Sequence, residues 1–310
     1  MIFAQRTEGN ESSERHWILQ ALFALAVAGL IAVGSASARA EEEEEEGDGG
    51  RGPVDPVSAP VTFESPYVHT SLRPFFLWHE FPKSSIFGGG DLQVYAVQAR
   101  FALTDRLAFI ATKDGYADLN PDGGSDEGGW LDLAAGFKYS IIKEGDFENL
   151  DLTVTPGLIY EATNGTRDVF QGNGEGVWRP FVSGALGLGD FNLIGSFGAD
   201  IPVDDGAEST SVDYHAHLSW EVSDLFVPLI EVNGITYVED GDALPVNFEA
   251  LDYGNLGASN VDGNTIITGA IGGRLRFSEN IHLGATYEAP LTEREDIFDE
   301  RVTVDLTFRF

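Results

Sequence analysis

The sequence predicts an all-β fold: a transmembrane antiparallel up-and-down β-barrel of about 12 strands. Three observations predict it. From about residue 71, apolar and polar residues alternate with a period of two and no helical period is sustained. Short connections alternate with long Gly-, Asp- and Asn-rich ones, as in a meander. The face opposite the apolar residues carries many charges, which a water-filled or ion-paired lumen holds better than a dry core does.

Composition excludes several classes of protein. The 310 residues include 18 Lys and Arg against 51 Asp and Glu, a formal net charge of -33, and no cysteine. The acidic balance argues against a nucleic-acid partner. Without cysteine there is no disulfide framework, thiolate zinc site or cysteine nucleophile. A hydrophobic content of 43% indicates a folded chain rather than a disordered one.

Residues 1–40 have the pattern of a secretory signal peptide. A polar stretch with Arg6 and Arg15 leads into an apolar run over residues 17–33, and Ala38 and Ala40 fit a cleavage site. We therefore expect cleavage after Ala40. The alternative is a permanent membrane anchor, because the apolar run is near the lower length limit for a spanning helix.

Residues 41–70 form an acidic, Pro- and Gly-rich N-terminal tail or linker. Six consecutive glutamates at residues 41–46 precede Gly- and Pro-rich sequence that continues to about Pro60. A block of like charges followed by Pro and Gly is typical of a solvated spacer. We expect no fold for this spacer and assign the barrel to residues 71–310.

The strands follow in order along the barrel region. The last of them shows the alternation most clearly, because one face of residues 301–310 holds Val302, Val304, Leu306, Phe308 and Phe310. The even number of strands places both chain ends on the short-turn side, and closure removes the long edges of an open sheet. The predicted strands lie near residues 71–80, 91–103, 106–116, 129–141, 150–161, 176–187, 191–201, 210–221, 225–237, 264–277, 281–291 and 300–310.

The polar face of these strands is expected to line the lumen. Carboxylates outnumber cations on it by nine to six, which predicts a mild cation preference for an open pore. The inward residues are predicted to be the cations Arg100, Lys138, Arg179, Arg274, Arg276 and Arg309, the carboxylates Asp114, Asp132, Asp151, Glu161, Asp213, Glu221, Glu231, Glu288 and Asp305, and the imidazoles His215 and His217.

Aromatic residues near the strand ends predict two interfacial girdles on the outer face. The general preference of strands for aromatics explains their presence, but not their clustering at strand ends. Near the long loops these residues are Phe75, Phe76, Trp78, Trp130 and Trp178, and near the short turns they are Tyr139 and Trp220.

Together, the signal peptide, the strand pattern and a terminal Phe after alternating apolar residues resemble Gram-negative outer-membrane β-barrel proteins of the porin and transporter type. The resemblance covers residues 71–310. It implies a location in the outer membrane, in contact with its lipid and lipopolysaccharide. It also implies that Phe308 and Phe310 form the C-terminal signature read by the barrel-assembly machinery. Residues 225–234 are similar to a segment of an outer-membrane transporter-like family associated with phenol meta-pathway degradation.

One arrangement has the residue types of an enzyme. His217 and Ser219 lie two apart on one strand face, where an imidazole can activate a hydroxyl, as in outer-membrane lipid hydrolases. Those enzymes face lipid, whereas the alternation turns His217 inward and places it near a short turn. His215, His217 and Glu231 could also form a metal site, but a hydrogen-bond network in which Glu231 and Asn233 pair across neighbouring strands is favoured.

The sequence therefore favours a passive channel or diffusion transporter for small solutes, without catalytic activity, cofactor or metal. The alternative is a non-conducting structural or surface-interaction barrel, because 12 strands make a lumen narrow enough for side chains to fill. A lipid hydrolase using His217 and Ser219 is a disfavoured third function. The transported solute is not identified.

Overall fold

The computed structural model describes residues 54–310. The predicted signal peptide and residues 41–53 of the tail lie outside the described residues. Within the described part, no helix is long and apolar enough to cross a bilayer. A single turn of 3-10 helix, η1 (Arg167–Val169), lies in one of the long loops.

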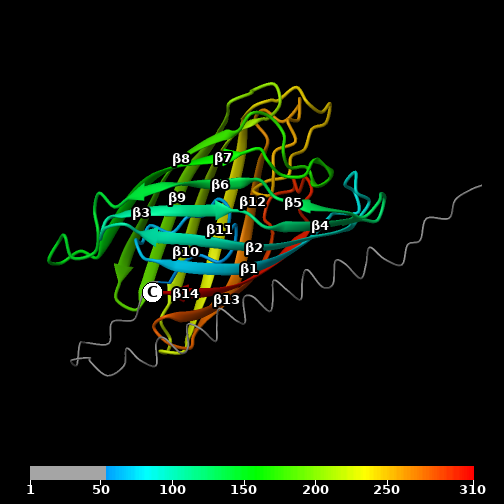
Figure 1. Ribbon diagram of the computed structural model, residues 1–310. Helices are drawn as coiled ribbons and strands as arrows, with labels where there is room; N and C mark the ends of the chain where they lie inside the picture. The colour runs from blue at the N-terminus through cyan, green and yellow to red at the C-terminus, as the bar shows by residue number, and fades with distance from the viewer. Residues whose placement is uncertain (1–53) are drawn as a thin grey trace, which may run out of the picture. The chain divides into compact units, whose positions relative to one another are not determined.

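The strands close into an antiparallel barrel, which confirms the predicted fold class (Figure 1). Each strand of the ring pairs with its two neighbours around it, and the first strand closes the ring by pairing with both the last strand and the second. The 12 strands of the ring are β1 (Ser71–Glu80), β2 (Gly90–Ala102), β3 (Leu107–Lys113), β6 (Leu133–Tyr139), β7 (Leu152–Ala162), β8 (Val177–Leu188), β9 (Phe191–Pro202), β10 (Thr210–Trp220), β11 (Phe226–Glu239), β12 (Thr265–Arg276), β13 (Ile281–Pro290) and β14 (Glu300–Arg309).

Two further strands, β4 (Tyr116–Pro121) and β5 (Glu127–Trp130), continue β3 and β6 toward the long loops. The predicted strands at 106–116 and 129–141 are therefore each divided in two. The first division is a β-bulge, because β2 pairs Ala99 with Ala111 but Tyr95 with Tyr116, which leaves one extra residue. Gly115 has a φ of 112°, and a Cβ there would collide with the backbone of Tyr95.

The bulge also corrects one predicted lumen residue. The Asp114 carboxylate accepts a hydrogen bond from the Val97 amide at 2.9 Å, so it caps the bulge instead of joining the lumen. Asp151 is likewise exposed, at the end of a strand, where the alternation no longer fixes the direction of a side chain. Both were expected to point inward, and both predictions are wrong.

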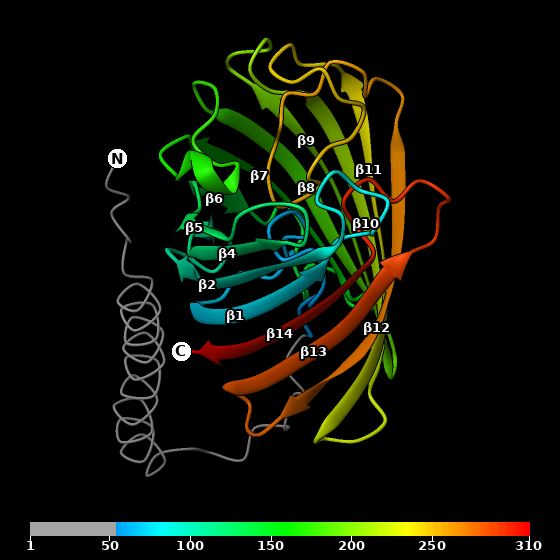
Figure 2. The same ribbon diagram turned by 90° about the vertical axis from the view of Figure 1, so that its right-hand side faces the viewer.

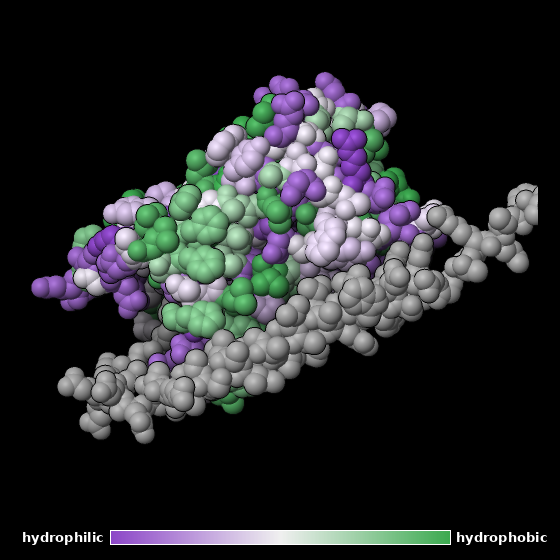
Figure 3. All heavy atoms as spheres, viewed as in Figure 1, coloured by the Kyte–Doolittle hydropathy of each residue, from purple (hydrophilic) through white to green (hydrophobic). Residues whose placement is uncertain are grey.

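The outer face of the barrel is apolar, as the alternation predicts. Exposed apolar side chains recur at every second position, for example Phe197, Ile230 and Ile271, while charged residues between them are buried. In Figure 3 hydrophobic residues gather over the strands of the visible wall, and hydrophilic residues gather toward the loops and turns. This surface is suited to hydrocarbon, with a charged interior behind it.

An arginine introduced in the middle of this surface tests whether the surface faces lipid. Ile271 is 65% exposed at the centre of β12, so Ile271→Arg is expected to destabilise the barrel by about 2–4 kcal/mol. Leu225→Arg, at an exposed residue of a short turn, is the matched control and should cost far less. Urea unfolding in lipid vesicles measures both, and equal effects would mean that Ile271 does not face lipid.

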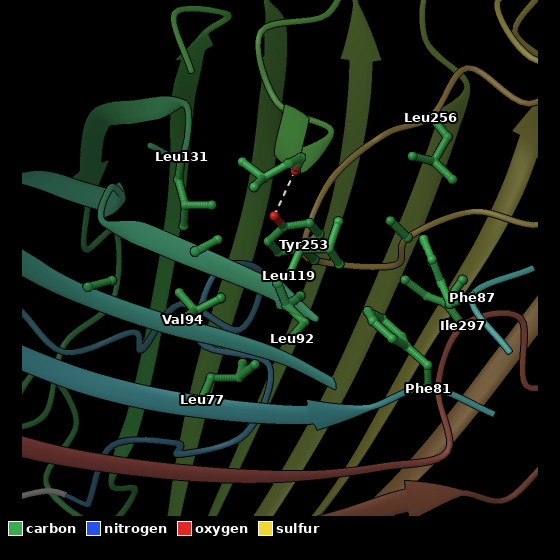
Figure 4. Packing of buried hydrophobic residues seen from close by; sticks show 14 of the residues in the cluster. Leu77, Phe81, Phe87, Leu92, Val94, Leu119, Leu131, Tyr253, Leu256 and Ile297 are labelled. Carbon is green, nitrogen blue, oxygen red and sulfur yellow. Dashed lines mark hydrogen bonds between the residues drawn. The ribbon is translucent and has the colours of Figure 1, made fainter. Parts of the chain in front are cut away.

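Long loops close the mouth of the barrel with an apolar cluster, shown in Figure 4. We call its loop residues the loop cap: Phe81, Phe87, Leu131, Val169, Ala250, Tyr253, Leu256 and Ile297. They pack on inward residues of the wall such as Leu92, and the Tyr253 hydroxyl donates to the Val169 carbonyl at 2.7 Å. Phe75 belongs to this interior cluster at 6% exposed, which corrects its predicted place in the outer aromatic girdle.

Candidate functional site

Residues 54–70 lie inside the barrel, and we call them the lumen plug (Figure 2). Val57 and Phe63 are 0% and 1% exposed. The chain rises from the short-turn side, turns at Ala59, and returns to begin β1 at Ser71. Ala59 has a φ of 46°, and its carbonyl accepts from the Phe63 amide at 2.9 Å. The prediction of a solvated spacer is therefore wrong for residues 54–60, because their polar groups find partners on the wall.

Glu64 anchors the returning arm of the plug. Its carboxylate receives Arg100 Nε at 2.9 Å and Arg100 Nη2 at 2.6 Å, while Lys138 Nζ donates to Oε1 at 2.8 Å. All three side chains are buried. A carboxylate held by a forked guanidinium and a second cation is a strong, geometrically specific contact.

Glu231 anchors the rising arm from the opposite wall. Its carboxylate accepts from the Val57 amide at 2.9 Å and from the Ser58 amide at 2.7 Å, and it also bonds to the Ser58 hydroxyl. His217 Nδ1 lies 2.7 Å from the same carboxylate. His215 Nδ1 lies 2.9 Å from Asn233, so the predicted pairing between these neighbouring strands is confirmed. The His215 ring also stacks on Phe63 of the plug, with centroids 4.8 Å apart.

A third anchor lies where the plug passes β12 and β14. Arg274 donates to the carbonyls of Asp55 at 2.7 Å and Pro56 at 3.0 Å. The same guanidinium binds both oxygens of Asp305, at 2.7 and 2.9 Å. Arg73 lies 2.6 Å from Asp305 and donates to the Val57 carbonyl at 3.1 Å, so one wall carboxylate holds two arginines against the plug.

Further wall side chains satisfy the carbonyls near the turn of the plug. Gln98 donates to Pro60 at 2.7 Å, and Arg179 donates to Thr62 at 3.1 Å. Because buried carbonyls are costly without hydrogen bonds, these donors explain how a Pro-rich segment is stable inside the lumen. Three more wall side chains donate to plug carbonyls: Lys138 to Ser65, Thr155 to Pro66 and Ser183 to Glu64.

The plug balances the charge of the wall around it. Six wall cations bond to the plug, and four wall carboxylates bond directly to these cations or to the plug, so this set of side chains has two excess positive charges. The plug supplies two carboxylates, Asp55 and Glu64. The six cations are Arg73, Arg100, Lys138, Arg179, Arg274 and Arg309, and the four carboxylates are Asp200, Asp213, Glu231 and Asp305.

The structure places the other predicted lumen residues on the interior side as well. Arg276 pairs with Glu221 at 2.7 Å, Glu161 bonds to Lys113, and Asp132 accepts from the Gly165 amide at 2.6 Å. Glu288 accepts from Asn233 at 2.8 Å. Of the predicted girdle, Trp130, Tyr139, Trp178 and Trp220 are exposed and Trp78 is half-buried. Phe308 is buried beside Leu72 of β1, and Phe310 is exposed.

The proposed hydrolase pair is not assembled. His217 uses Nδ1 for Glu231, and neither its Nε2 nor the Ser219 hydroxyl has a hydrogen-bond partner among the described residues. The two side chains therefore do not bond to each other, as an activated serine requires. In the described part of the chain, no group of three or more His, Asp or Glu side chains is arranged to hold a metal ion.

Two cavities lie between the turn of the plug and the loop between β11 and β12. The centres of water-sized molecules can occupy about 30 Å³ of one, which is lined by Ala59 and His215, and about 40 Å³ of the other, which is lined by Val61 and Glu208. Leu251 and Asp252 of the loop line both of them. The plug and the loop between β11 and β12 thus both occupy the interior, with space between the two.

Sequence reasoning missed several of these residues. Arg73 and Gln98 were not assigned inward, and Arg301, which binds Asp252 of the loop at 2.8 Å, was not singled out. The alternation places Arg73 opposite Leu72 and Arg301 opposite Val302, so period two contained the signal for both. Nothing local indicated that Glu64 would reach Lys138, 74 positions away.

Comparisons with known proteins agree with the fold. No family model and no curated protein matches the chain, so the similarity of residues 225–234 to the phenol meta-pathway family stays a prediction. Among solved structures, an outer membrane channel from Pseudomonas putida F1 is 15% identical with a TM-score of 0.55, covering 83% of this chain and 100% of that one. The NanC porin is 9% identical with a TM-score of 0.49, covering 78% and 100%. The KdgM porin is 10% identical with a TM-score of 0.43, covering 77% and 99%. The likeness to the Pseudomonas channel shows that this chain has the fold of an outer-membrane β-barrel.

Proposed function

We propose that this protein is an outer-membrane channel for small solutes, and that residues 54–70 close its lumen in the present structure. The charge of the wall carries the proposal. The six wall cations that bond to the plug outnumber by two the wall carboxylates that bond to these cations or to the plug, and Asp55 and Glu64 of the plug supply two more carboxylates. A barrel that is always filled is stable with wall side chains that are apolar or that pair with one another. Here the wall is instead complementary in charge to a segment of the same chain, and this favours a passage that opens when the segment moves out.

The cavities beyond the plug support the same function. They lie between the plug and the loop between β11 and β12, where a solute that passes one would rest before the other opens. The first is lined by apolar side chains together with Asp213, His215 and Asn233, which suits a small solute that has both apolar and polar groups. No cofactor or energy source is part of the proposal.

Location and assembly belong to the proposal too. The apolar outer face and the barrel fold support insertion in the outer membrane after removal of the signal peptide, in contact with lipid and lipopolysaccharide. We place Phe308 and Phe310 in the signal for the barrel-assembly machinery. Both lie in the last strand or just after it, and the Phe310 amide bonds to the Thr70 carbonyl at 3.0 Å, beside the start of β1.

A non-conducting structural barrel is the second candidate. The loop cap favours it, because its aromatic side chains stack over the mouth; Phe81 and Phe87, for example, have ring centroids 4.4 Å apart. The two functions differ in whether the plug ever leaves the lumen.

A single cysteine introduced in place of Val57 distinguishes them, because the natural chain has none. Val57 is fully buried, so a membrane-impermeant thiol reagent can reach Val57→Cys only when the plug leaves, and the modified side chain cannot return. In planar bilayers, treated Val57→Cys is expected to show a stepwise, irreversible rise in conductance.

The untreated variant, the cysteine-free chain with reagent, and exposed Ser125→Cys with reagent are the controls, and none should show the rise. Mass spectrometry of the same samples reports whether the introduced thiol was modified. A Val57→Cys protein that stays unmodified, or that is modified without conducting, would support the structural barrel and contradict the channel.

A further inference from the structure

The larger cavity lies directly beyond the turn of the plug, at the long-loop end of the barrel. Val61 and Thr62 form one side of it, the ends of several wall strands form the next, and Leu251 and Asn255 of the loop between β11 and β12 complete it. The centres of water-sized groups can occupy about 40 Å³ of it, whereas a single water molecule needs about 10–15 Å³, so a molecule of a few heavy atoms fits.

The charges of its lining are not balanced. Four carboxylates and two cations line the cavity. Arg179 lies 2.6 Å from Asp200, and Lys113 bonds to Glu161. Asp252 is held by Arg301, whose Nη2 lies 2.8 Å from it. The fourth carboxylate, Glu208, has no cation within ion-pair distance among the described residues.

Glu208 is also left without a hydrogen bond on one oxygen. It is 5% exposed, and no described group bonds to its buried Oε2. This carboxylate lies against Gly174 of the loop between β7 and β8, where a Cβ would come within 2.6 Å of Oε2. Glu208 lines the cavity, and a buried carboxylate with one unpartnered oxygen is costly in its charged form until a cation or donor reaches the group.

We propose that this cavity binds a small organic cation, with its ammonium group against Glu208 and its apolar part against Val61, Val177 and Leu251. One carboxylate balances one positive charge and accepts an N–H donor, whereas Ca²⁺ requires six or more oxygens around it. The apolar lining residues match the carbon chain of an amine. The proposal goes beyond the channel function and does not depend on conduction.

The pKa of Glu208 makes the binding depend on pH. Burial, followed by the charge of Glu161 and then those of Asp132 and Asp200, raises the pKa of the Glu208 carboxyl to about 8, against the opposing charge of Lys113. A raised pKa means that the carboxyl is largely protonated at pH 6.5 and ionised at pH 9. Because the ammonium group pairs with the ionised form, binding strengthens as pH rises through this window and releases a proton.

The test is calorimetric titration of the intact, detergent-folded chain with n-butylammonium. We expect Glu208→Gln to weaken binding about tenfold or more at pH 9, and a fall to pH 6.5 to weaken binding to the natural chain by a similar factor. Asp205→Asn, an exposed carboxylate of the same loop, is the charge-matched control and should bind like the natural chain. Far-UV circular dichroism confirms that each variant is folded.

Two further probes exclude other ligands. n-Butanol has the same carbon chain without the charge and should bind at least about tenfold more weakly than the amine. Calcium chloride should neither bind at Glu208 nor displace the amine. The proposal is overturned if no amine binding is detected, if Glu208→Gln binds the amine as tightly as the natural chain, if butanol competes equally, or if Ca²⁺ binds in a Glu208-dependent way.

Discussion

A chain that lacks residues 41–69 is expected to form a barrel whose mean single-channel conductance is about tenfold or more above that of the intact chain. The deletion removes the lumen plug but keeps residues 1–40 and every strand. The wall cations that bonded to Glu64, Asp55 and the plug carbonyls are then solvated by water. Shortening the loop between β11 and β12 over residues 245–258, which carries part of the loop cap, should raise the conductance of the same variant further. Residues of this segment line the far side of both cavities.

The same deletion is expected to give an anion preference. Without Asp55 and Glu64, the two excess positive charges of the surrounding wall are no longer balanced, and they attract anions into the pore. Reversal potentials under a salt gradient measure the preference, and adding Arg100→Gln with Lys138→Gln should abolish it. A barrel without the plug and with the shortened loop that still fails to conduct would contradict the channel function. Conduction with cation preference would contradict the charge balance.

Asp305→Ala is expected to have the largest effect on stability, about 3–5 kcal/mol. Asp305 is 1% exposed and holds both Arg73 and Arg274, which are 3% and 1% exposed. Its removal leaves two buried guanidinium groups without their carboxylate, and charges buried without partners are strongly destabilising. Urea unfolding in lipid vesicles gives the change in free energy.

The control for Asp305→Ala is the removal of one partner of a solvent-exposed ion pair. Asp105 and Lys143 pair at 2.7 Å on an exposed turn, where solvent screening makes such pairs nearly neutral for stability, so Asp105→Ala should leave unfolding unchanged. Asp305→Asn should destabilise the barrel less than Asp305→Ala does, because an amide oxygen still accepts hydrogen bonds. If Asp305→Ala unfolds like Asp105→Ala, water already reaches these arginines and the lumen is not closed by the plug.

The alternation of apolar and polar residues was sufficient to predict the barrel and, for most strand residues, whether the side chain points into the lumen or outward. His215, His217, Glu231 and Arg274 point inward because period two leaves each side chain of a paired strand only two directions. The same rule failed at Asp114, where a bulge adds one residue, and at Asp151, which lies just outside regular pairing. A bulge depends on the partner strand, and the local pattern does not reveal it.

The plug could not be predicted because its stability comes from partners that are distant in the sequence. Residues 54–66 are rich in proline and polar groups, a composition typical of spacers. What fixes them is a set of wall donors such as Gln98 and Arg179, whose role is visible only once the strands are arranged in a ring. The cation preference expected from the sequence stays a prediction, because a count of charges along the strands does not show which of them the plug neutralises.

The anchors of the plug also constrain the order of folding. Arg309 and Asp55 bond across 254 positions in the chain, and Ser58 and Glu231 bond across 173. Contacts of such long range form late, since nearly the whole polypeptide must first be brought together. β1 pairs with β14, so the ring closes only when the last strand arrives, and the segment immediately before β1 must enter by then. Closure of the barrel and packing of the plug therefore become one cooperative event, because the first described residues of the chain are fixed only when the last strand is in place.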